Sequence, residues 1–418
     1  MWSEAKRSRG FLLAASLALL AAFGTAGCGF LSTAGPVEEG AIEPATPAGA
    51  TADLNLGPGV RPLSLGPGDK SSPRISPSGE RVAFVLDGYV ADKSLYAQDT
   101  RRRTAEDFSA TSTDWLSEQS LAVMGPSSGE DAGVSEEKGS SLFVVRPGDP
   151  PQTAELAEGV QATGTQANGG SLAAAVETPG GDAPATTLVR LRAGGDAVRI
   201  FPVDLRGRVS GLSLSSDGRE AVLAVRVASG ENAGRVEVVT YRFSEGRPRR
   251  AALLDDGLEV IGAPQWTTRG IYFGAGEEGD DEADYALYRV PGDAVQGYEP
   301  AMLGEDFIPA SIAVSPDGAS LAVLGRRNSR SPTDLYVLDL ASGSLDAVTA
   351  NENMEIKTKP RDLAWSPDGS YALIVARGIL SGPKVYDGSP AENLSSAFYN
   401  VYGVPVGTTV RAARGRAE

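Results

Sequence analysis

The chain has 418 residues, no histidine and a single cysteine, and it carries a formal charge of −16 at pH 7. Without histidine it cannot use a Ser-His-Asp or Cys-His nucleophile, an imidazole base or histidine-bound zinc or haem, and one thiol closes no intramolecular disulfide. The acidity also argues against nucleic acid as a partner, because binding to a phosphate backbone depends on Lys and Arg.

The first 28 residues have the pattern of an export signal. Lys6, Arg7 and Arg9 precede an apolar run over 11–23, and small residues then lead to Cys28. This pattern resembles the bacterial lipoprotein signal peptide, in which the cysteine becomes the first mature residue and carries lipid. The resemblance implies a signal peptide over 1–27, lipidation of Cys28, and an extracytoplasmic protein whose acyl chains anchor it to the membrane lipid. An uncleaved membrane anchor and a buried structural cysteine are the other interpretations.

Residues 28–60 are rich in Pro, Gly, Ala, Ser and Thr and show little periodicity. This composition predicts a disordered, lipidated linker that holds the folded part, residues 61–418, away from the membrane. Short apolar alternation at 54–56 and 62–65 also fits a first strand of the folded part.

A turn sequence recurs about every 50 residues in the rest of the chain, which has 51 Gly and 27 Pro. In Ser-Pro-Asp-Gly, Pro presets φ, Asp bonds nearby backbone, and Gly accepts a positive φ, so each copy predicts a tight turn followed by a strand. The copies lie at 75–84, 214–223, 314–323 and 365–373, with weaker ones at 115–123, 166–173 and 266–273.

Four short strands fit into each repeat, which predicts an all-β fold, a β-propeller of seven blades, with six or eight also open. The continuously apolar run 221–225 suits a strand that packs against neighbouring blades on both faces. We expect the ring to close by pairing residues near Leu63 with the strand around 399–402, so that no long sheet edge stays exposed.

The repeat resembles that of TolB-type propellers, the WD-like Ser-Pro-Asp-Gly family of bacterial envelope proteins. A lipidated N-terminus followed by a propeller is also similar in style to LpqB-type actinobacterial lipoproteins. These resemblances imply the fold strongly and a function only weakly.

Several residue groups invite a functional interpretation, but packing or solvation explains each of them better. Trp115, Trp266 and Trp365 take similar places in three repeats and are interpreted as packing residues rather than as an aromatic binding ring. The acidic loop 277–284 lacks the spacing of a calcium loop, so a solvated loop is the preferred interpretation.

The repeat aspartates and the arginine clusters are likewise interpreted without a site. Asp217, Asp317 and Asp368 are predicted to be turn residues spread around one rim, and not a catalytic set. The clusters of arginines are predicted to be exposed charges in loops or in the C-terminal tail: Arg101, Arg102, Arg103, Arg326, Arg327, Arg330, Arg411, Arg414 and Arg416.

The sequence therefore predicts a membrane-anchored module of the cell envelope that binds a protein or peptide on a propeller face. Since it shows no assembled catalytic, cofactor or metal residues, we expect a chain that is not an enzyme. The alternative is a carboxylate- or metal-dependent hydrolase or lyase acting on glycan in the central funnel, and converging acidic side chains at the axis would favour it.

Overall fold

The computed structural model describes Leu56 and residues 59–406, apart from 97–98, 127–139, 147–151, 166–170, 179–184, 193–197, 204, 206, 278–285, 292–297, 301–306, 329, 352–353 and 379–397. By its internal contacts the chain divides into two compact units, Met1–Glu43 and Pro44–Glu418, and the described residues belong to the second. The predicted signal peptide and Cys28 lie outside the described residues. No helix among the described residues has the length and apolar character needed to span a membrane.

The described residues form an all-β structure with six antiparallel sheets. Four of these sheets have four strands each, paired in chain order. Their strands are β2 (Lys70–Ile75), β3 (Arg81–Leu86), β4 (Tyr89–Ser94) and β5 (Thr100–Arg102); β13 (Gly207–Leu214), β14 (Glu220–Val227), β15 (Val236–Arg242) and β16 (Arg247–Leu253); β17 (Leu258–Thr267), β18 (Gly270–Glu277), β19 (Ala286–Pro291) and β20 (Glu299–Pro300); and β21 (Ile308–Val314), β22 (Ser320–Arg326), β23 (Asp334–Asp339) and β24 (Leu345–Ala347).

A fifth sheet has seven strands, because one long strand belongs to two repeats. Val160 of β9 marks the boundary: the residues before it pair with β8, and those after it pair with β10. When the sheet is divided at Val160, it consists of two four-stranded groups, which agrees with the seven predicted repeats. The number of blades itself stays a prediction. The strands are β6 (Ser112–Ser117), β7 (Ser120–Pro126), β8 (Ser140–Arg146), β9 (Gln152–Thr165), β10 (Ser171–Thr178), β11 (Ala185–Arg192) and β12 (Val198–Val203).

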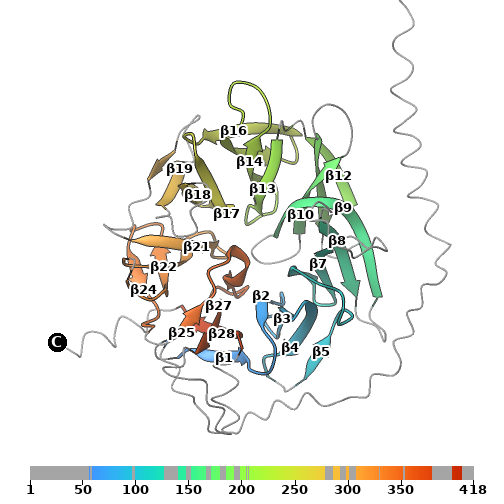
Figure 1. Cartoon of the computed structure of the whole chain (residues 1–418), viewed down its shortest axis with the longest axis vertical. Coiled ribbons are helices and arrows are strands. Elements are labelled where there is room, and N and C mark those ends of the chain that lie inside the picture. Colours follow the sequence, from blue (N-terminus) through green and yellow to red (C-terminus); the bar gives the residue numbers. More distant parts are fainter. Residues whose placement is uncertain are drawn as a thin grey trace, which may run out of the picture. The chain divides into compact units, whose positions relative to one another are not determined.

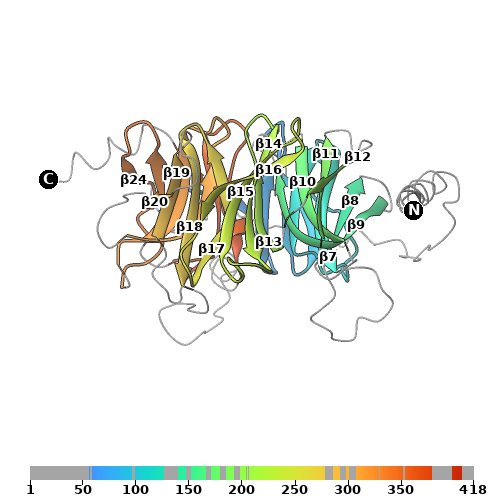
Figure 2. The same ribbon diagram turned by 90° about the horizontal axis from the view of Figure 1, so that it is seen from above.

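The sixth sheet joins the two ends of the folded unit. Its strands are β1 (Arg61–Ser64), β28 (Asn400–Pro405), β27 (Tyr371–Gly378), β25 (Met354–Ile356) and β26 (Ala364–Trp365). Arg61 pairs with Gly403 and Pro62 with Tyr402, so the predicted closure of the ring is confirmed. Figure 1 shows the sheets following one another around a ring, and the side view in Figure 2 shows their strands running along the ring axis. The predicted β-propeller is therefore confirmed.

Buried strands pack between neighbouring sheets, as their apolar sequences predict. On β14, Ala221 and Leu223 face one core cluster with residues of β10 and β11, whereas Val222 faces another with residues of β18. All three side chains have no exposed surface. The second strand of a sheet is therefore apolar at consecutive positions because both of its faces are covered.

The repeated turns form as predicted at one rim of the ring. Asp317 accepts hydrogen bonds at one oxygen from the Ser315 hydroxyl (2.6 Å) and from the Ala319 backbone N–H (3.0 Å). Gly318 follows with φ 71°, a left-handed conformation that glycine adopts without strain. Asp217 and Asp368 make the same pair of bonds, which confirms that the three aspartates are turn residues.

Candidate functional site

A cavity of about 640 Å³ is lined by the innermost strands of the ring, β2, β6, β9, β13, β17 and β21, together with the segment that precedes β26. Several of these strands carry a β-bulge. Their pairing register shifts between Ser71 and Arg74 on β2, between Val209 and Gly211 on β13, and between Ile261 and Gln265 on β17. Because a bulge adds residues on one strand only, it changes the direction of side chains locally, and here the bulged residues line the cavity.

The largest interruption of an inner strand separates β25 from β26. The intervening segment 357–363 contains a short 3-10 helix, η1 (Pro360–Asp362), which begins at a proline whose fixed φ suits a first helical position. Four charged residues of this segment line the cavity: Lys357, Lys359, Arg361 and Asp362. Our sequence analysis missed them. The signal in the sequence was a run of charged residues just before the repeat at 365–373.

Two arginines from distant parts of the chain converge on Asp114 of β6. Arg74 Nε donates to Asp114 Oδ1 at 2.8 Å, and Arg361 Nη1 donates to Asp114 Oδ2 at 3.3 Å. Arg361 also reaches Thr163 on β9, donating to its backbone oxygen at 3.1 Å and to its hydroxyl. Arg361 thus links the last repeat to the second and third across the cavity.

Asp362 is the second carboxylate of the cavity, and its side chain is only half satisfied. Its Oδ1 accepts the Ser72 backbone N–H at 2.8 Å, whereas its Oδ2 is buried without a hydrogen-bond partner. The residue is 2% exposed, and this burial raises the pKa of its carboxyl group, against the effects of the Ser72 N–H and of the charges on Lys357 and Arg74. Ser72 itself has φ 50°, an unfavourable value for a residue other than glycine, which places backbone strain next to this carboxyl group.

Lys357 connects the cavity to the rim opposite the repeated turns. Its Nζ donates to the backbone oxygen of Lys70 at 3.0 Å and lies 4.3 Å from the centre of the Tyr399 ring. Tyr399 in turn donates its hydroxyl to Glu355, and its own pKa is raised to about 12, first by burial and then by that carboxylate.

The lining has a positive formal charge within an acidic protein. Among the described lining residues, Arg74, Lys357, Lys359 and Arg361 are cationic, and two carboxylates oppose them. The whole chain carries −16. A cavity with this charge pattern attracts anions, since the low-dielectric walls strengthen its local field.

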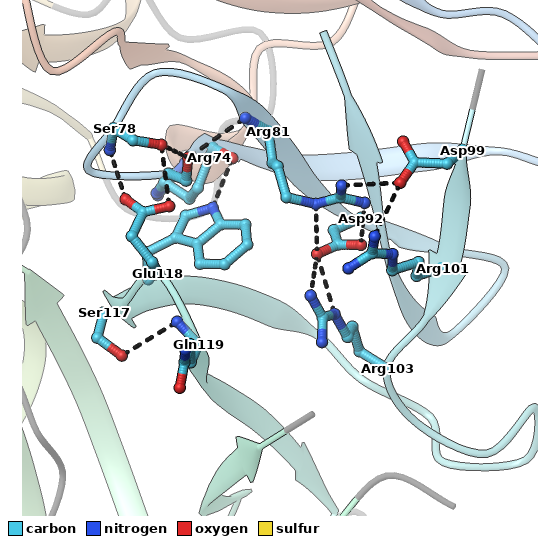
Figure 3. Close-up of polar contacts among 12 residues, drawn as sticks. Arg74, Ser78, Arg81, Asp92, Asp99, Arg101, Arg103, Ser117, Glu118 and Gln119 are labelled. Carbon is cyan, nitrogen blue, oxygen red and sulfur yellow. Dashed lines mark hydrogen bonds and ion pairs between the residues drawn. The ribbon is translucent and has the colours of Figure 1, made fainter. Parts of the chain in front are cut away.

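Ion pairs join β3, β4 and the residue after β5 in the sheet that contains β2. Figure 3 shows Arg81 and Arg103 converging on Asp92, which has no exposed surface. The prediction that the cluster 101–103 is exposed charge in a loop is therefore wrong for Arg103, which is 7% exposed, because the paired carboxylate offsets the cost of burying it. Arg101 and Arg102 are exposed, although they lie on β5 and not in a loop.

Two hydrogen bonds also join the first two repeats at the turn rim, where Glu118 accepts the Ser78 backbone N–H and, at 2.9 Å, its hydroxyl (Figure 3). Trp115 and Trp365 donate their indole N–H groups to backbone oxygens of the preceding inner strand, at Arg74 (3.0 Å) and Ala313 (2.9 Å). Both rings also line the cavity, and the interpretation of the three tryptophans as packing residues stays a prediction.

Other residues singled out in the sequence contribute nothing to this site. Arg326 is half-buried, and Arg327 and Arg330 are exposed. Glu277 is exposed at the end of β18, while the rest of the acidic loop 277–284 and the arginines of the C-terminal tail lie outside the described residues. Within the described part of the chain, no group of three or more Cys, Asp or Glu side chains is placed to hold a metal ion.

No protein-family model matches the chain, and no curated protein matches it in sequence. Its fold is similar to that of an oligogalacturonate lyase from Vibrio parahaemolyticus, with a TM-score of 0.51, 11% identity, and coverage of 86% of this chain and 96% of the lyase. An oligogalacturonate lyase in complex with manganese gives a TM-score of 0.52 at 11% identity, over 84% of this chain and 94% of that one. Kuenenia stuttgartiensis hydrazine synthase gives a TM-score of 0.50 at 13% identity, over 75% of this chain and 94% of that one.

These comparisons contradict our prediction that the chain is not an enzyme, because the structures that its propeller resembles are those of enzymes. The prediction rested on the missing histidine and on the absence of a catalytic set in the sequence. Missing histidine excludes only imidazole chemistry, and the carboxylates and guanidinium groups of the cavity come together only through the fold. At identities of 11–13% the likeness itself establishes the fold alone.

Proposed function

We propose that the axial cavity is the active site of a carboxylate-dependent hydrolase or lyase that cleaves glycans containing uronic acids. The observation that carries this proposal is the meeting of Arg74 and Arg361 with the half-satisfied, buried carboxyl group of Asp362 in one cavity. Acidic side chains that converge at the axis are also the feature that, from the sequence, would favour a hydrolase or lyase. Among the similar structures, two are of lyases whose name specifies oligogalacturonate, a uronic acid oligomer.

The guanidinium groups would bind the sugar carboxylate, since arginine pairs with carboxylates through parallel, charge-assisted hydrogen bonds. Asp114 holds both arginines in place in the absence of such a ligand. Neutralising the sugar carboxylate also favours elimination, because it makes the neighbouring C–H bond more acidic.

Asp362 would supply the proton that the leaving sugar oxygen needs when the glycosidic C–O bond breaks. Its raised pKa favours the protonated form, which is the form that a general acid requires. In hydrolysis, water adds to the sugar carbon and releases a proton, which restores the acid form of Asp362. In elimination, a water molecule takes the proton from the carbon next to the carboxyl group, and a C=C bond forms as the C–O bond breaks.

The manganese of one similar structure finds no matching donor set in this cavity. Manganese favours carboxylate, carbonyl and water ligands, but Asp114 is paired with two arginines, which leaves Asp362 as a single carboxylate in the described lining. The proposed steps use no metal.

Incubation of the protein with oligogalacturonate tests the proposal. Elimination would produce the ultraviolet absorbance of an unsaturated uronate, and hydrolysis would produce reducing ends without it. We expect Asp362→Asn to lower the rate about 10²- to 10⁴-fold, the usual contribution of a general acid. The wild-type rate should fall as pH rises through the raised pKa of Asp362, because the acid then loses its proton.

The exposed Asp256, which lies between β16 and β17, provides the matched control, and Asp256→Asn should keep the wild-type rate. Uronic acid oligomers that yield neither product, or an Asp362→Asn variant as active as wild type, would contradict the proposal.

We also propose that lipidation of Cys28 places the enzyme on the outer side of the cell membrane, on the evidence of the signal-like sequence at 1–28. Cys28→Ser should abolish acylation and release the protein from the membrane fraction, as measured by mass spectrometry and immunoblotting. Retention of the variant in that fraction would refute the anchor. Docking of an envelope protein or peptide on a propeller face stays a prediction.

A further inference from the structure

The axial cavity changes in chemical character along its length. Each inner strand leads toward the turn rim, so position along these strands gives the level in the cavity. Arg74, Asp114, Arg361 and Asp362 form a charged layer. The lining residues that follow on the same strands, toward the turns, are apolar.

We call this apolar part of the lining the collar, and define it by Ile75, Pro77, Leu214, Val314 and Pro367. Each of these residues lies in the last position of an inner strand or in the turn that follows. Val314, Pro77 and Pro367 are half-buried and so retain surface that a ligand can cover. The indole N–H groups of Trp115 and Trp365 at this level are already bonded to backbone, so the two rings present no unsatisfied polar group to a ligand.

We infer, on the basis of the proposed function, that the substrate is a short uronide with an apolar or aromatic aglycone. Its carboxylate would pair with the arginines of the charged layer, and its aglycone would lie against the collar. A volume of 640 Å³ is in the range of pockets that enclose a small ligand, so it suits a glycoside of about two rings better than a polymer. Both ends of such a molecule are matched, one by charge and the other by apolar surface.

Binding of glycosides that resist cleavage tests the inference separately from catalysis. We would titrate the full mature chain with phenyl 1-thio-β-D-glucuronide, methyl 1-thio-β-D-glucuronide and phenyl 1-thio-β-D-glucoside in a calorimeter. The phenyl uronide should bind about tenfold more tightly than the methyl uronide, given the apolar area that a phenyl ring buries. It should also bind more tightly than the uncharged phenyl glucoside.

Variants separate the two ends of the cavity. Val314→Thr, which keeps the size of the side chain but adds a hydroxyl group, should remove the advantage of phenyl over methyl and leave binding of the methyl uronide unchanged. Arg361→Gln should weaken both uronides. Val337→Thr is the matched control, because Val337 is half-buried on β23 of the same sheet but does not line the cavity. Melting temperatures check that each variant folds, and Val314→Ala replaces Val314→Thr if that variant does not.

Equal affinity for the phenyl and methyl uronides, or equal effects of Val314→Thr and Val337→Thr, would overturn the inference. Selective binding without cleavage of any uronide would overturn the proposed function and leave only the binding preference of the cavity for uronides with an apolar aglycone. Cleavage of oligogalacturonate with no preference for an apolar aglycone would support the proposed function and overturn the inference.

Discussion

Among the described residues, the two carboxylates that line the axial cavity have different surroundings. Asp114 pairs with two arginines, whereas Asp362 has one oxygen on the Ser72 N–H and the other buried without a partner. A pair of carboxyl groups in different environments can divide the tasks of an acid and a charged group. At the scale of single residues, it is burial and not residue type that raises the pKa of Asp362.

Lys70 illustrates the same principle at a structural position. It is 2% exposed, and its Nζ donates to the backbone oxygens of Gly66 (2.6 Å), Pro67 (3.2 Å) and Gly68 (2.8 Å). Burial lowers its pKa from 10.5 to about 8, although Asp87 and Asp69 oppose the shift. Between these two pH values the unfolded chain binds more protons at this lysine than the folded protein does.

We therefore predict that Lys70 makes the free energy of unfolding increase as pH rises from about 8 to 10.5, by at most about 3 kcal/mol. Lys70→Met should remove this contribution and also destabilise the protein at pH 7 by about 1–3 kcal/mol, because the carbonyl groups of the buried Gly66 and Gly68 lose their donor. Urea denaturation across this pH range measures both effects. Wild type and variant showing the same pH dependence would contradict the assigned role.

At the scale of elements, the repeated turn is determined by its local sequence, whereas the position of the segment 357–363 is determined by the strands around it. The turn is specified by adjacent residues, and its hydrogen bonds stay within five positions of the chain. The segment 357–363 forms no strand, and it brings its charged side chains to the cavity because β25 and β26 on either side of it both pair with β27.

The turn before β27 gives a direct test of this local specification. Asp368 Oδ1 accepts the Ser366 hydroxyl (2.6 Å), the Ser370 N–H (3.0 Å) and the Ser370 hydroxyl (2.7 Å). Asp368→Ala should lower the free energy of unfolding by about 1–2 kcal/mol through the loss of these bonds. Asp256→Ala, at an exposed turn position, should have almost no effect.

The same bonds hold the pKa of Asp368 below its ordinary value. Its stabilising effect is therefore present above the ordinary pKa of an aspartate and is lost as pH falls through the lowered value. Thermal melts between pH 7 and pH 3 should show a shallower acid destabilisation in Asp368→Ala than in wild type. A steeper acid dependence in the variant would contradict this assignment.

The whole molecule depends on the closure of its ring. β28 lies between β1 and β27, and Val401, Tyr402 and Val404 on it have no exposed surface. The glycine at 403 approaches Leu63 closely, since a Cβ there would lie 3.2 Å from that side chain. The last strand thus joins the ends of the folded unit through both hydrogen bonds and packing.

Ending the chain after Ser381 should abolish cooperative unfolding, because β1 loses its partner and the sheet that carries η1 loses a buried strand. Circular dichroism melts and size-exclusion chromatography measure this effect. Ending the chain after Val406 is the control, since it removes no described strand and should leave the melting temperature unchanged. A stable monomer ending at Ser381 would contradict the role of closure.

The sequence by itself determined the all-β fold, the repeated turns, the packing of β14 between neighbouring sheets and the joining of the two ends. These features depend on neighbouring residues or on apolar patterns that recur along the chain. The site depended on tertiary structure, because Asp114 and Arg361 meet across 247 positions and no local pattern marks them as neighbours. Which side chains reach the axis is decided by bulges and by the break between β25 and β26, and these become visible only when the ring is assembled.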